Sequence, residues 1–327
     1  MKNVAVIGAG ITGISLANLL QKKVNLTVFE KSRGVGGRMA TRRAEPYQFN
    51  HGAQYFKIEN KEFKNFLQPL IQNNIIKQME ANHIEILNKE VIKKIKTYNK
   101  IYYTAESKMN SVVKYLINNN FFIKLLCKIE KTIKENDKWF IIDSDKVSYG
   151  PDDWLLITIP PYQALEILYN NFKYLDIIKK IKMRSCYSLM LGFNKVKEFD
   201  FDTVLFLDED VQWLTITKKI LENKKYYNLL INSSYNFAEK NINCSKDKIS
   251  DYLIKQVSDI LKCELNNYEH KALHFWKYAM SKENNNLGSL LDEDLKVIVC
   301  GDWCMNGKVE GGFLSAKDAT NKILKYI

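Results

Sequence analysis

The length and composition of the chain limit what it can be. With 327 residues, 46% of them hydrophobic and 26% charged, the sequence suffices for one large or two moderate domains and excludes a disordered chain. No apolar run approaches the ~20 residues of a membrane-spanning helix, and no basic stretch precedes an apolar one at the start, so we expect a cytoplasmic protein that is not bound to a membrane. The net charge of +12 accompanies a general excess of lysine, asparagine and isoleucine. Without a basic stripe interleaved with aromatic residues, it does not indicate nucleic-acid binding.

The cysteines point to a reducing compartment. There is no CxxC pair, and no four-ligand cluster forms with the four histidines. We therefore predict reduced, mostly buried thiols, with neither disulfides nor a zinc site, and no other metal. The cysteines concerned are Cys127, Cys186, Cys244, Cys263, Cys300 and Cys304.

The first twenty residues read as a strand, a glycine turn and a helix. The short, β-branched run Val4–Ile7 predicts a buried strand, and apolar residues at helical spacing from Ile14 to Leu20 predict a helix. Between them lies a GxGxxG motif. Its first glycine permits a tight turn, its second lets the backbone approach a pyrophosphate, and its third lets helix and strand pack closely (Gly8, Gly10 and Gly13).

An acidic residue completes this unit. The run Leu26–Phe29 predicts a second strand, and Glu30 ends it, twenty residues after Gly10. This is the position of a carboxylate that accepts a hydrogen bond from an adenosine ribose. Strand, helix and acid in register predict a dinucleotide-binding Rossmann unit, and a plain glycine-rich turn is the alternative interpretation.

Arginine and glycine are distributed unevenly. The chain has only five arginines, and four of them fall within eleven residues: Arg33, Arg38, Arg42 and Arg43, with Arg184 elsewhere. A guanidinium grips phosphate through two parallel hydrogen bonds, whereas an ammonium acts as a point charge. Seven of the fourteen glycines lie in the first 52 residues and four more between 301 and 312. Both distributions indicate that the two ends of the chain approach an anionic cofactor, although a mobile basic loop would also explain the arginines.

The middle of the chain predicts alternating helices and strands. Helical spacing is found over 63–71, where Pro69 is a possible interruption, then over 109–116, from 162 onward and over 249–261. Short strands are expected within 75–104, and further strands over 121–129, 139–142, 154–159, 183–193, 204–207, 212–216, 227–231 and 295–299. In 183–193 the letters alternate, so that one face can be core and the other can line a cavity. A closing helix is expected from Gly311.

Three blocks of residues resemble a known family. A second glycine pair with arginine, Gly36-Gly37-Arg38, is typical of flavoproteins of the glutathione-reductase and amine-oxidase type. The blocks Asn50–Phe56 (NHGAQYF), Cys300–Cys304 (CGDWC) and Val309–Ser315 (VEGGFLS) resemble, more specifically, bacterial renalase-like proteins. The resemblance extends from end to end but is close only in these terminal blocks. Lys108 stands where the family has the glycine of a Pro-Gly-Met turn.

The resemblance implies an α/β fold, a Rossmann-type FAD-binding domain with an inserted α+β substrate domain, as in p-hydroxybenzoate hydroxylase. We accordingly assign residues 1–60, 105–165 and 290–327 to the FAD-binding domain, and 61–104 and 166–289 to the substrate domain.

The resemblance also implies noncovalent FAD. Asp302 would bind a ribityl hydroxyl, and a helix beginning at Gly311 would direct amides and its dipole at the flavin. Lys31 and Glu310 could equally be solvated charges, and Cys300 or Cys304 leaves open a thioether-linked flavin. The implied FAD contacts are Gly8, Gly10, Ile11, Thr12, Gly13, Glu30, Lys31, Arg33, Gly37, Arg38, Gln54, Tyr55, Ile129, Asp302, Glu310, Gly311 and Gly312.

The substrate that the resemblance implies is a misreduced nicotinamide dinucleotide, a 2- or 6-dihydro isomer of NAD(P). Its oxidation to NAD(P)⁺ would deliver a hydride to flavin N5, and O₂ would become hydrogen peroxide. His274 matches the histidine of the family's His-Arg-Trp motif and would hold the nicotinamide carboxamide, although a buried structural histidine fits as well. Phe275 replaces the arginine, and Met280-Ser281 replace an Arg-Pro pair, with Lys277 and Lys282 as possible substitutes.

Two other functions stay open. An amine oxidase or desaturase would need an aromatic cage, for which Tyr187, Trp276 and Tyr278 are candidates. A flavin-bound scaffold or redox sensor without turnover would suit the altered His-Phe-Trp block. The sequence does not indicate an oligomeric state.

Overall fold

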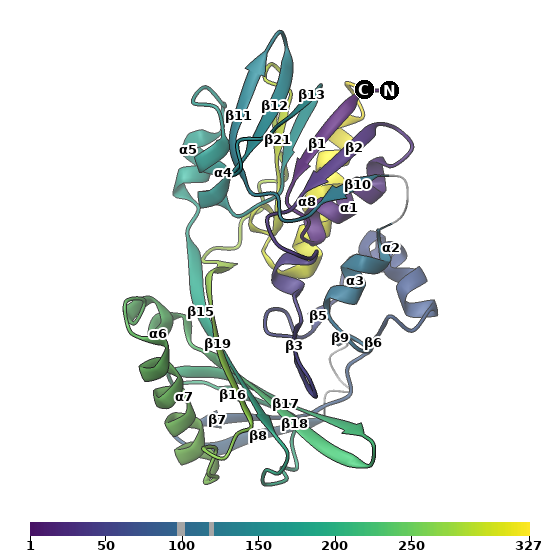
Figure 1. Cartoon of the computed structure of the whole chain (residues 1–327). Coiled ribbons are helices and arrows are strands. Elements are labelled where there is room, and N and C mark those ends of the chain that lie inside the picture. The colour runs from purple at the N-terminus through teal and green to yellow at the C-terminus, as the bar shows by residue number, and fades with distance from the viewer. Residues whose placement is uncertain (97–101, 118–120) are drawn as a thin grey trace.

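The computed structural model of the chain describes residues 1–96, 102–117 and 121–327. Over these ranges the chain forms two units. One contains both termini, and the other is built on a large, mostly antiparallel sheet (Figure 1).

The first unit is built on a six-stranded sheet in the order β10-β2-β1-β14-β21-β20. All neighbours run parallel except β20, which pairs antiparallel with β21 at one edge. The strand order reverses between β1 and β14, and ligands of such sheets bind beyond the carboxyl ends of the strands at this point. The strands are β1 (Asn3–Ile7), β2 (Asn25–Phe29), β10 (Phe122–Lys124), β14 (Trp154–Ile157), β20 (Leu290–Asp292) and β21 (Val297–Val299).

Both faces of this sheet are covered, which explains why its strands read as continuous apolar runs. Val4 and Val6 of β1 share a core with helices α1 (Ile11–Leu20), α2 (Lys61–Gln72), α3 (Asn110–Tyr115) and α8 (Lys308–Ile323). Ala5 and Ile7 face the other way. They share a core with α4 (Pro161–Ile167), α5 (Leu175–Lys180) and a three-stranded sheet of β11 (Ile129–Glu135), β12 (Lys138–Asp143) and β13 (Ser148–Asp152).

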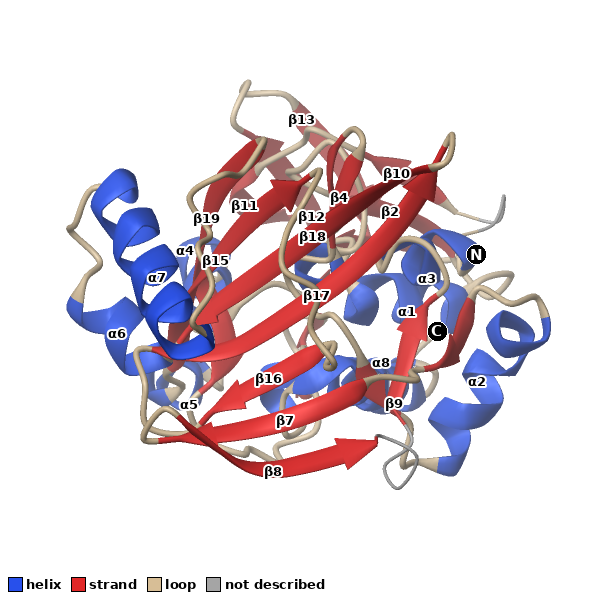
Figure 2. Cartoon of the chain, turned by 90° about the horizontal axis from the view of Figure 1, so that it is seen from below, coloured by secondary structure: helices blue, strands red, loops and turns tan. Residues whose placement is uncertain are grey.

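The second unit is a seven-stranded sheet in the order β19-β15-β18-β17-β16-β7-β8, with α6 and α7 packed on one face (Figure 2). Leu189, Leu191 and Phe193 of β15 face these helices, so Ser188 and Met190 face the other side. The elements are β7 (Asn82–Leu87), β8 (Glu90–Lys96), β15 (Met183–Phe193), β16 (Thr203–Phe206), β17 (Val211–Leu221), β18 (Lys224–Ser233), β19 (His270–Ser281), α6 (Tyr235–Lys240) and α7 (Lys246–Leu261).

A hairpin of the first unit covers part of that other side. Strands β3 (Arg42–Ala44) and β4 (Tyr47–Phe49) pair antiparallel and extend from the first unit toward the large sheet (Figure 1). A Cβ atom added at Gly192 would lie 2.6 Å from Cγ of Tyr47, so only glycine lets the Tyr47 ring lie on β15. The hairpin therefore fixes the two units against each other.

The fold class predicted from the sequence is confirmed: β7, β8 and β15–β19 are inserted between the first and last strands of the Rossmann sheet. The predicted strand over 183–193 has the observed bounds. Pro69 lies inside α2 near its end without breaking it.

The packing places two segments differently from the predicted boundaries. The described residues of 61–104 are divided between the two units. α2 packs on the core of the first unit, and so do β6 (Ile76–Gln78) and β9 (Tyr102–Ala105), two strands of a small sheet with β5 (Phe56–Lys57). Of these described residues, only those of β7 and β8 pair in the second sheet. The segment from 166 to the end of α5 also packs under the first sheet. In both cases the amphipathic pattern identified a helix but not the sheet that its apolar face covers.

Candidate active site

The GxGxxG turn lies at the carboxyl end of β1. The amide of Gly8 donates to the carbonyl of Phe29 at 2.8 Å, and Gly8 has a φ of +108° that suits glycine alone. A Cβ atom at Gly13 would lie 1.9 Å from the Gly8 oxygen, whereas a Cβ atom at Gly10 would meet nothing within 4 Å. Gly8 and Gly13 thus make the turn possible, and Gly10 borders open space where a phosphate can approach the backbone.

Glu30 is buried at the end of β2, with 7% of its surface exposed. Its carboxylate accepts from the amides of Ala9 at 2.9 Å and Ser32 at 2.8 Å. Each oxygen keeps a further lone pair for a ribose hydroxyl. The amide of Cys127 donates to the Glu30 carbonyl at 2.9 Å, which brings the segment leading to Ile129 beside this strand end; the Ile129 side chain itself is buried.

The second glycine pair joins the first. The Gly36 amide donates to the Ala9 carbonyl at 2.9 Å, and a Cβ atom at Gly37 would lie 3.5 Å from Cα of Gly10. Lys31 and Arg33, in the loop between, are exposed. The two glycine motifs therefore border one site.

Arg38 joins this site to the other end of the chain. Its guanidinium makes a two-pronged ion pair with Asp302, with nitrogen–oxygen distances of 2.5 and 2.9 Å. It also donates to the carbonyl of Ala279 on β19 at 3.2 Å. Arg38 and Asp302 are 264 positions apart in the sequence. One side chain thus ties together the amino-terminal loop, the carboxyl-terminal block and the inserted sheet.

The closing helix corrects one prediction. α8 begins at Lys308, not at Gly311, so the free amides of its first turn belong to residues before Gly311. Gly311 and Gly312 serve close packing instead. Added Cβ atoms would lie 1.9 Å from the oxygen of Met305 and 2.8 Å from Cγ2 of Ile11, respectively. Through Gly312, α8 lies directly against the start of α1.

Glu310 makes a structural contact. Its carboxylate accepts from the amides of Glu59 at 2.7 Å and Asn60 at 3.0 Å, where α2 begins. Thr12 lies where α1 meets α8, because its Oγ1 would be 3.0 Å from a Cβ atom at Gly312.

A polar network that the sequence analysis missed holds Gln54. Gln54 donates to Asn232 Oδ1 of β18 at 2.7 Å, and Asn232 donates to Ser188 Oγ at 2.7 Å. The hydroxyl of Thr215 on β17 donates to the side-chain oxygen Oε1 of Gln54 and accepts from the Trp213 indole at 2.9 Å. These side chains come from three strands of the second sheet. Strand alternation places them on one face, but their pairing with Gln54 carries no local sequence signal.

Tyr55 lies beside this network. Its ring contacts Tyr102, at 4.9 Å between ring centroids, and Trp213, at 5.5 Å. Burial raises the pKa of the Tyr55 hydroxyl, so it stays protonated at neutral pH.

His274 and Trp276 meet His51 of the amino-terminal loop. The His51 ring lies 5.0 Å from the His274 ring and 5.1 Å from the Trp276 ring, and the Trp276 indole donates to the His51 carbonyl at 2.8 Å. Burial, the neighbouring His274 and Arg42 lower the pKa of His51 to about 4, against a smaller opposite effect of the Phe49 and Ala40 carbonyls. Burial, with the charges of Arg42 and Lys246, also lowers the pKa of His274. Both imidazoles are therefore neutral at pH 7.

The structure contradicts the placement of Tyr187 in the substrate cavity. Its ring lies on the helix-covered face of β15 against Phe275, at 4.8 Å, and its hydroxyl donates to the Asn241 carbonyl at 3.0 Å. Alternation had separated the two faces of this strand correctly, but the aromatic residue belongs to the core face. Phe275, which stands where the His-Arg-Trp motif has arginine, shares that face and packs against the same core. Tyr278 stacks on Tyr162 of α4 at 5.5 Å.

Cys300 and Cys304 are both fully buried, and burial raises the pKa of the Cys300 thiol to about 12 and that of Cys304 well above its usual value. Four of the six cysteines are buried and all six are free; Cys244 is exposed and Cys263 intermediate.

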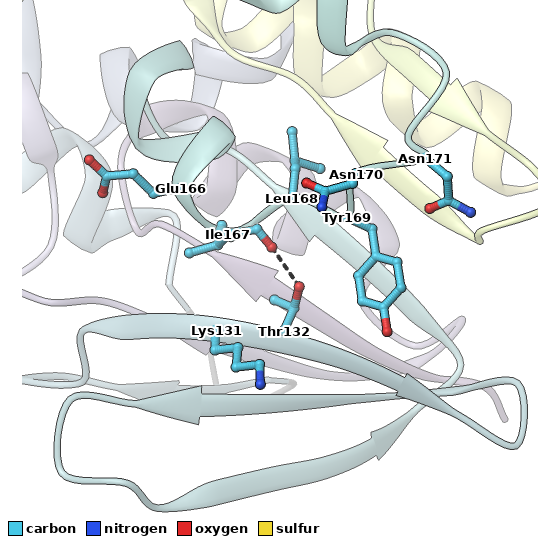
Figure 3. Close-up of a pocket in the computed structure, with 8 residues that line it drawn as sticks. All are labelled: Lys131, Thr132, Glu166, Ile167, Leu168, Tyr169, Asn170 and Asn171. Atoms are coloured by element: carbon cyan, nitrogen blue, oxygen red, sulfur yellow. Dashed lines mark hydrogen bonds between the residues drawn. The ribbon is translucent and has the colours of Figure 1, made fainter.

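A surface cavity of about 430 Å³ lies between β11 and the end of α4, apart from the glycine motifs and the Arg38–Asp302 pair (Figure 3). Thr132 donates across it to the carbonyl of Ile167 at 2.6 Å. None of the predicted site residues lines this cavity.

Known proteins are similar to this chain in sequence and in fold. A family model described as an NAD(P)-binding Rossmann-like domain matches residues 6–70. The chain is 23% identical to renalase from Mus musculus, with 100% of both chains covered. In fold it is similar to a putative protoporphyrinogen oxidase from Exiguobacterium, with a TM-score of 0.76 at 10% identity over 98% of both chains. A redesigned putrescine oxidase gives the same TM-score at 10% identity, over 100% of this chain and 99% of that one.

These similarities confirm the resemblance and the two-unit fold that the terminal motifs predicted. Among the residues that the structure describes, no helix is long and apolar enough to cross a membrane.

Proposed function

We propose that this renalase-like oxidoreductase uses noncovalently bound FAD to oxidise a misreduced dihydronicotinamide dinucleotide, a 2- or 6-dihydro isomer of NAD(P), with O₂ as the final acceptor. The observation that carries the proposal is that residues from both chain ends meet beyond the carboxyl ends of β1 and β21, where ligands of such sheets bind. The pair Arg38–Asp302 joins the GGR motif to the CGDWC block, and Gly312 lies against Ile11 of the first helix.

The residues at this edge of the sheet fit an adenine dinucleotide. Open space beside Gly10 suits the pyrophosphate, and the fixed Glu30 carboxylate suits the adenosine ribose. Asp302, whose side chain is 8% exposed, has lone pairs beyond those that Arg38 occupies. The burial of Cys300 and Cys304 supports a noncovalent mode, because a buried, protonated thiol is a poor nucleophile.

A flavin bound there would accept the hydride and pass two electrons to O₂, giving hydrogen peroxide. The protein's own part is to hold the substrate. His274 and Trp276 pack directly against His51, with ring centroids 5.0 and 5.1 Å from the His51 ring, and a neutral His274 can donate or accept a hydrogen bond with a carboxamide. Hydride transfer needs no acid or base from the chain, which agrees with the lack of a charged imidazole here.

The aromatic group around Tyr55 favours a second candidate, an amine oxidase. Tyr55, Tyr102 and Trp213 cluster beside the polar network, and Lys57 Nζ already lies 5.6 Å from the centre of the Tyr102 ring, as an ammonium ion attracted to an aromatic ring would. Putrescine oxidase, one of the similar structures, has this fold. The predicted cage loses Tyr187, however, because that ring lies in the core.

One experiment separates the candidates. Purified holoprotein is mixed anaerobically with the 2- and 6-dihydro isomers of NAD and NADP, with ordinary NADH and with a polyamine panel, and flavin absorbance is followed. We expect rapid bleaching with the isomers alone and hydrogen peroxide once air is admitted. Bleaching by amines would select the second candidate. Bleaching by none would favour a flavin-bound scaffold or sensor without turnover.

A further inference from the structure

The β3–β4 hairpin separates two adjacent arginines onto opposite faces. Arg42 pairs directly with Phe49, and Arg43 pairs with Gln48. Directly opposed residues of an antiparallel pair share a face. The Phe49 ring faces the second sheet, since it stacks on His270 of β19 at 5.7 Å. Arg42 therefore lies on the face toward the second sheet, and Arg43 lies on the outer face.

The surroundings of Arg42 form an imidazole-lined corner. Phe49, which pairs with Arg42, stacks on His270, and the positive charge of Arg42 contributes to the lowered pKa of His51, His270 and His274, after burial in each case and after His274 at His51. The side chain of Arg42 is exposed, and among the described residues it makes no ion pair. Because the neighbouring imidazoles are neutral, the guanidinium N–H groups of Arg42 stay available to bind an anion.

Strand β19 runs from the Arg38–Asp302 pair to the surroundings of Arg42. At one end of β19 the carbonyl of Ala279 accepts a hydrogen bond from Arg38. Trp276 and His274 come next along the strand, and at its other end the His270 ring stacks on Phe49. At ~3.3 Å per residue, Ala279 and His274 are separated by roughly 16 Å. Along β19, Trp276 and His274 therefore lie between the contact with Arg38 and His270 beside Phe49, and a substrate held by His274 can extend toward Arg42.

We propose that Arg42 is a specificity-determining residue that binds a phosphate of the substrate. The inference rests on the proposed function and names the group that the second unit recognises. A guanidinium with free donors matches phosphate oxygens through two parallel bonds. The alternatives on β19 serve other contacts: Phe275 lies in the core, and Lys277 lies over the ring of Tyr278 at 5.5 Å.

The test compares Arg42→Gln with Arg43→Gln, its matched control on the opposite face. The substrates are a dihydronicotinamide isomer as dinucleotide, as mononucleotide and as phosphate-free riboside, and the readout is anaerobic flavin reduction. We expect Arg42→Gln to lower the apparent affinity for both phosphate-bearing forms about 10-fold or more, to leave the riboside unchanged, and to be partly rescued by Arg42→Lys. Equal effects on all three substrates, or equal effects of the two Gln variants, would overturn the proposal.

A binding measurement separates this inference from the proposed function. If no isomer reduces the wild-type flavin, the proposed function fails, and Arg42 is then tested through the shift of the flavin spectrum on titration with NAD⁺ and with nicotinamide riboside. Weaker binding of NAD⁺ alone in Arg42→Gln supports the phosphate contact. Equal NAD⁺ affinity in Arg42→Gln and wild type refutes it.

Discussion

Replacing Gly10 with alanine tests the cofactor site without disturbing the fold. Gly10 precedes α1 with a φ of −75° and a ψ of −176°, a conformation open to any residue, and an added Cβ atom would meet nothing within 4 Å. The methyl group would occupy the space into which a pyrophosphate must fit. A change in FAD binding would therefore report the ligand and not the protein's own packing.

The expected magnitudes differ enough to be separated. At a helix N-cap alanine is less favourable than glycine by up to about 1 kcal/mol, and the restricted unfolded chain returns about 0.4–1 kcal/mol. The free energy of unfolding of the apoprotein should therefore change by less than about 0.5 kcal/mol. Loss of one backbone hydrogen bond to a charged phosphate costs about 1.5–3 kcal/mol, or roughly 10- to 150-fold in the FAD dissociation constant.

Two other glycines provide the controls. Gly34→Ala, also with nothing within 4 Å, should change neither quantity. Gly13→Ala, whose Cβ atom would lie 1.9 Å from the Gly8 oxygen, should destabilise the apoprotein itself. Urea unfolding gives the stability, and quenching of flavin fluorescence on reconstitution gives the affinity. Wild-type FAD affinity in Gly10→Ala would refute the placement of the pyrophosphate.

Three further predictions concern the second unit, pH and the flavin linkage. Asn232→Ala removes the hydrogen-bond partner of Gln54. Because a hydrogen bond contributes about 1 kcal/mol, KM should rise several-fold, while FAD binding changes little. Unchanged kinetics would show that the network is purely structural. The pKa of His51 is lowered from 6.5 to about 4 in the folded protein. Between these two pH values the unfolded chain therefore binds more protons at His51 than the folded chain does, so the free energy of unfolding should fall as the pH drops from about 6.5 to about 4. His51→Phe should flatten this dependence of the urea midpoint, and an unaltered slope would count against it. Acid precipitation should release all flavin to the supernatant, from wild type and from Cys300→Ser and Cys304→Ser alike, and flavin in the wild-type pellet would indicate a covalent bond.

The sequence predicted best what depends on local pattern. The strand, turn and helix of the first twenty residues and the alternating strand 183–193 each carry their signal within one element. The start of α8 was misplaced because Gly307 caps it without a side-chain hydrogen bond, so the usual N-cap residue is missing.

The contacts that define the site are long-range and were not predictable in this way. Gln54 meets Asn232 across 178 positions, and no periodicity within either segment reports the other. Tyr187 was assigned to the cavity because alternation separates two faces without saying which one a helix will cover. The family resemblance supplied Arg38 and Asp302 as separate cofactor contacts, and only the structure reveals their ion pair.

The order of strands in the first sheet has a consequence for biosynthesis. β21 pairs with β14, and β20 lies beyond it, so the sheet lacks its last two strands until the ribosome has passed Val299. Asp302 and α8 emerge later still, whereas the inserted sheet, complete by Ser281, can fold beforehand. The two halves of the proposed FAD site can therefore meet only after α8 has been made, and a chain that ends before Val297 keeps its glycine turn but lacks Asp302 and Gly312.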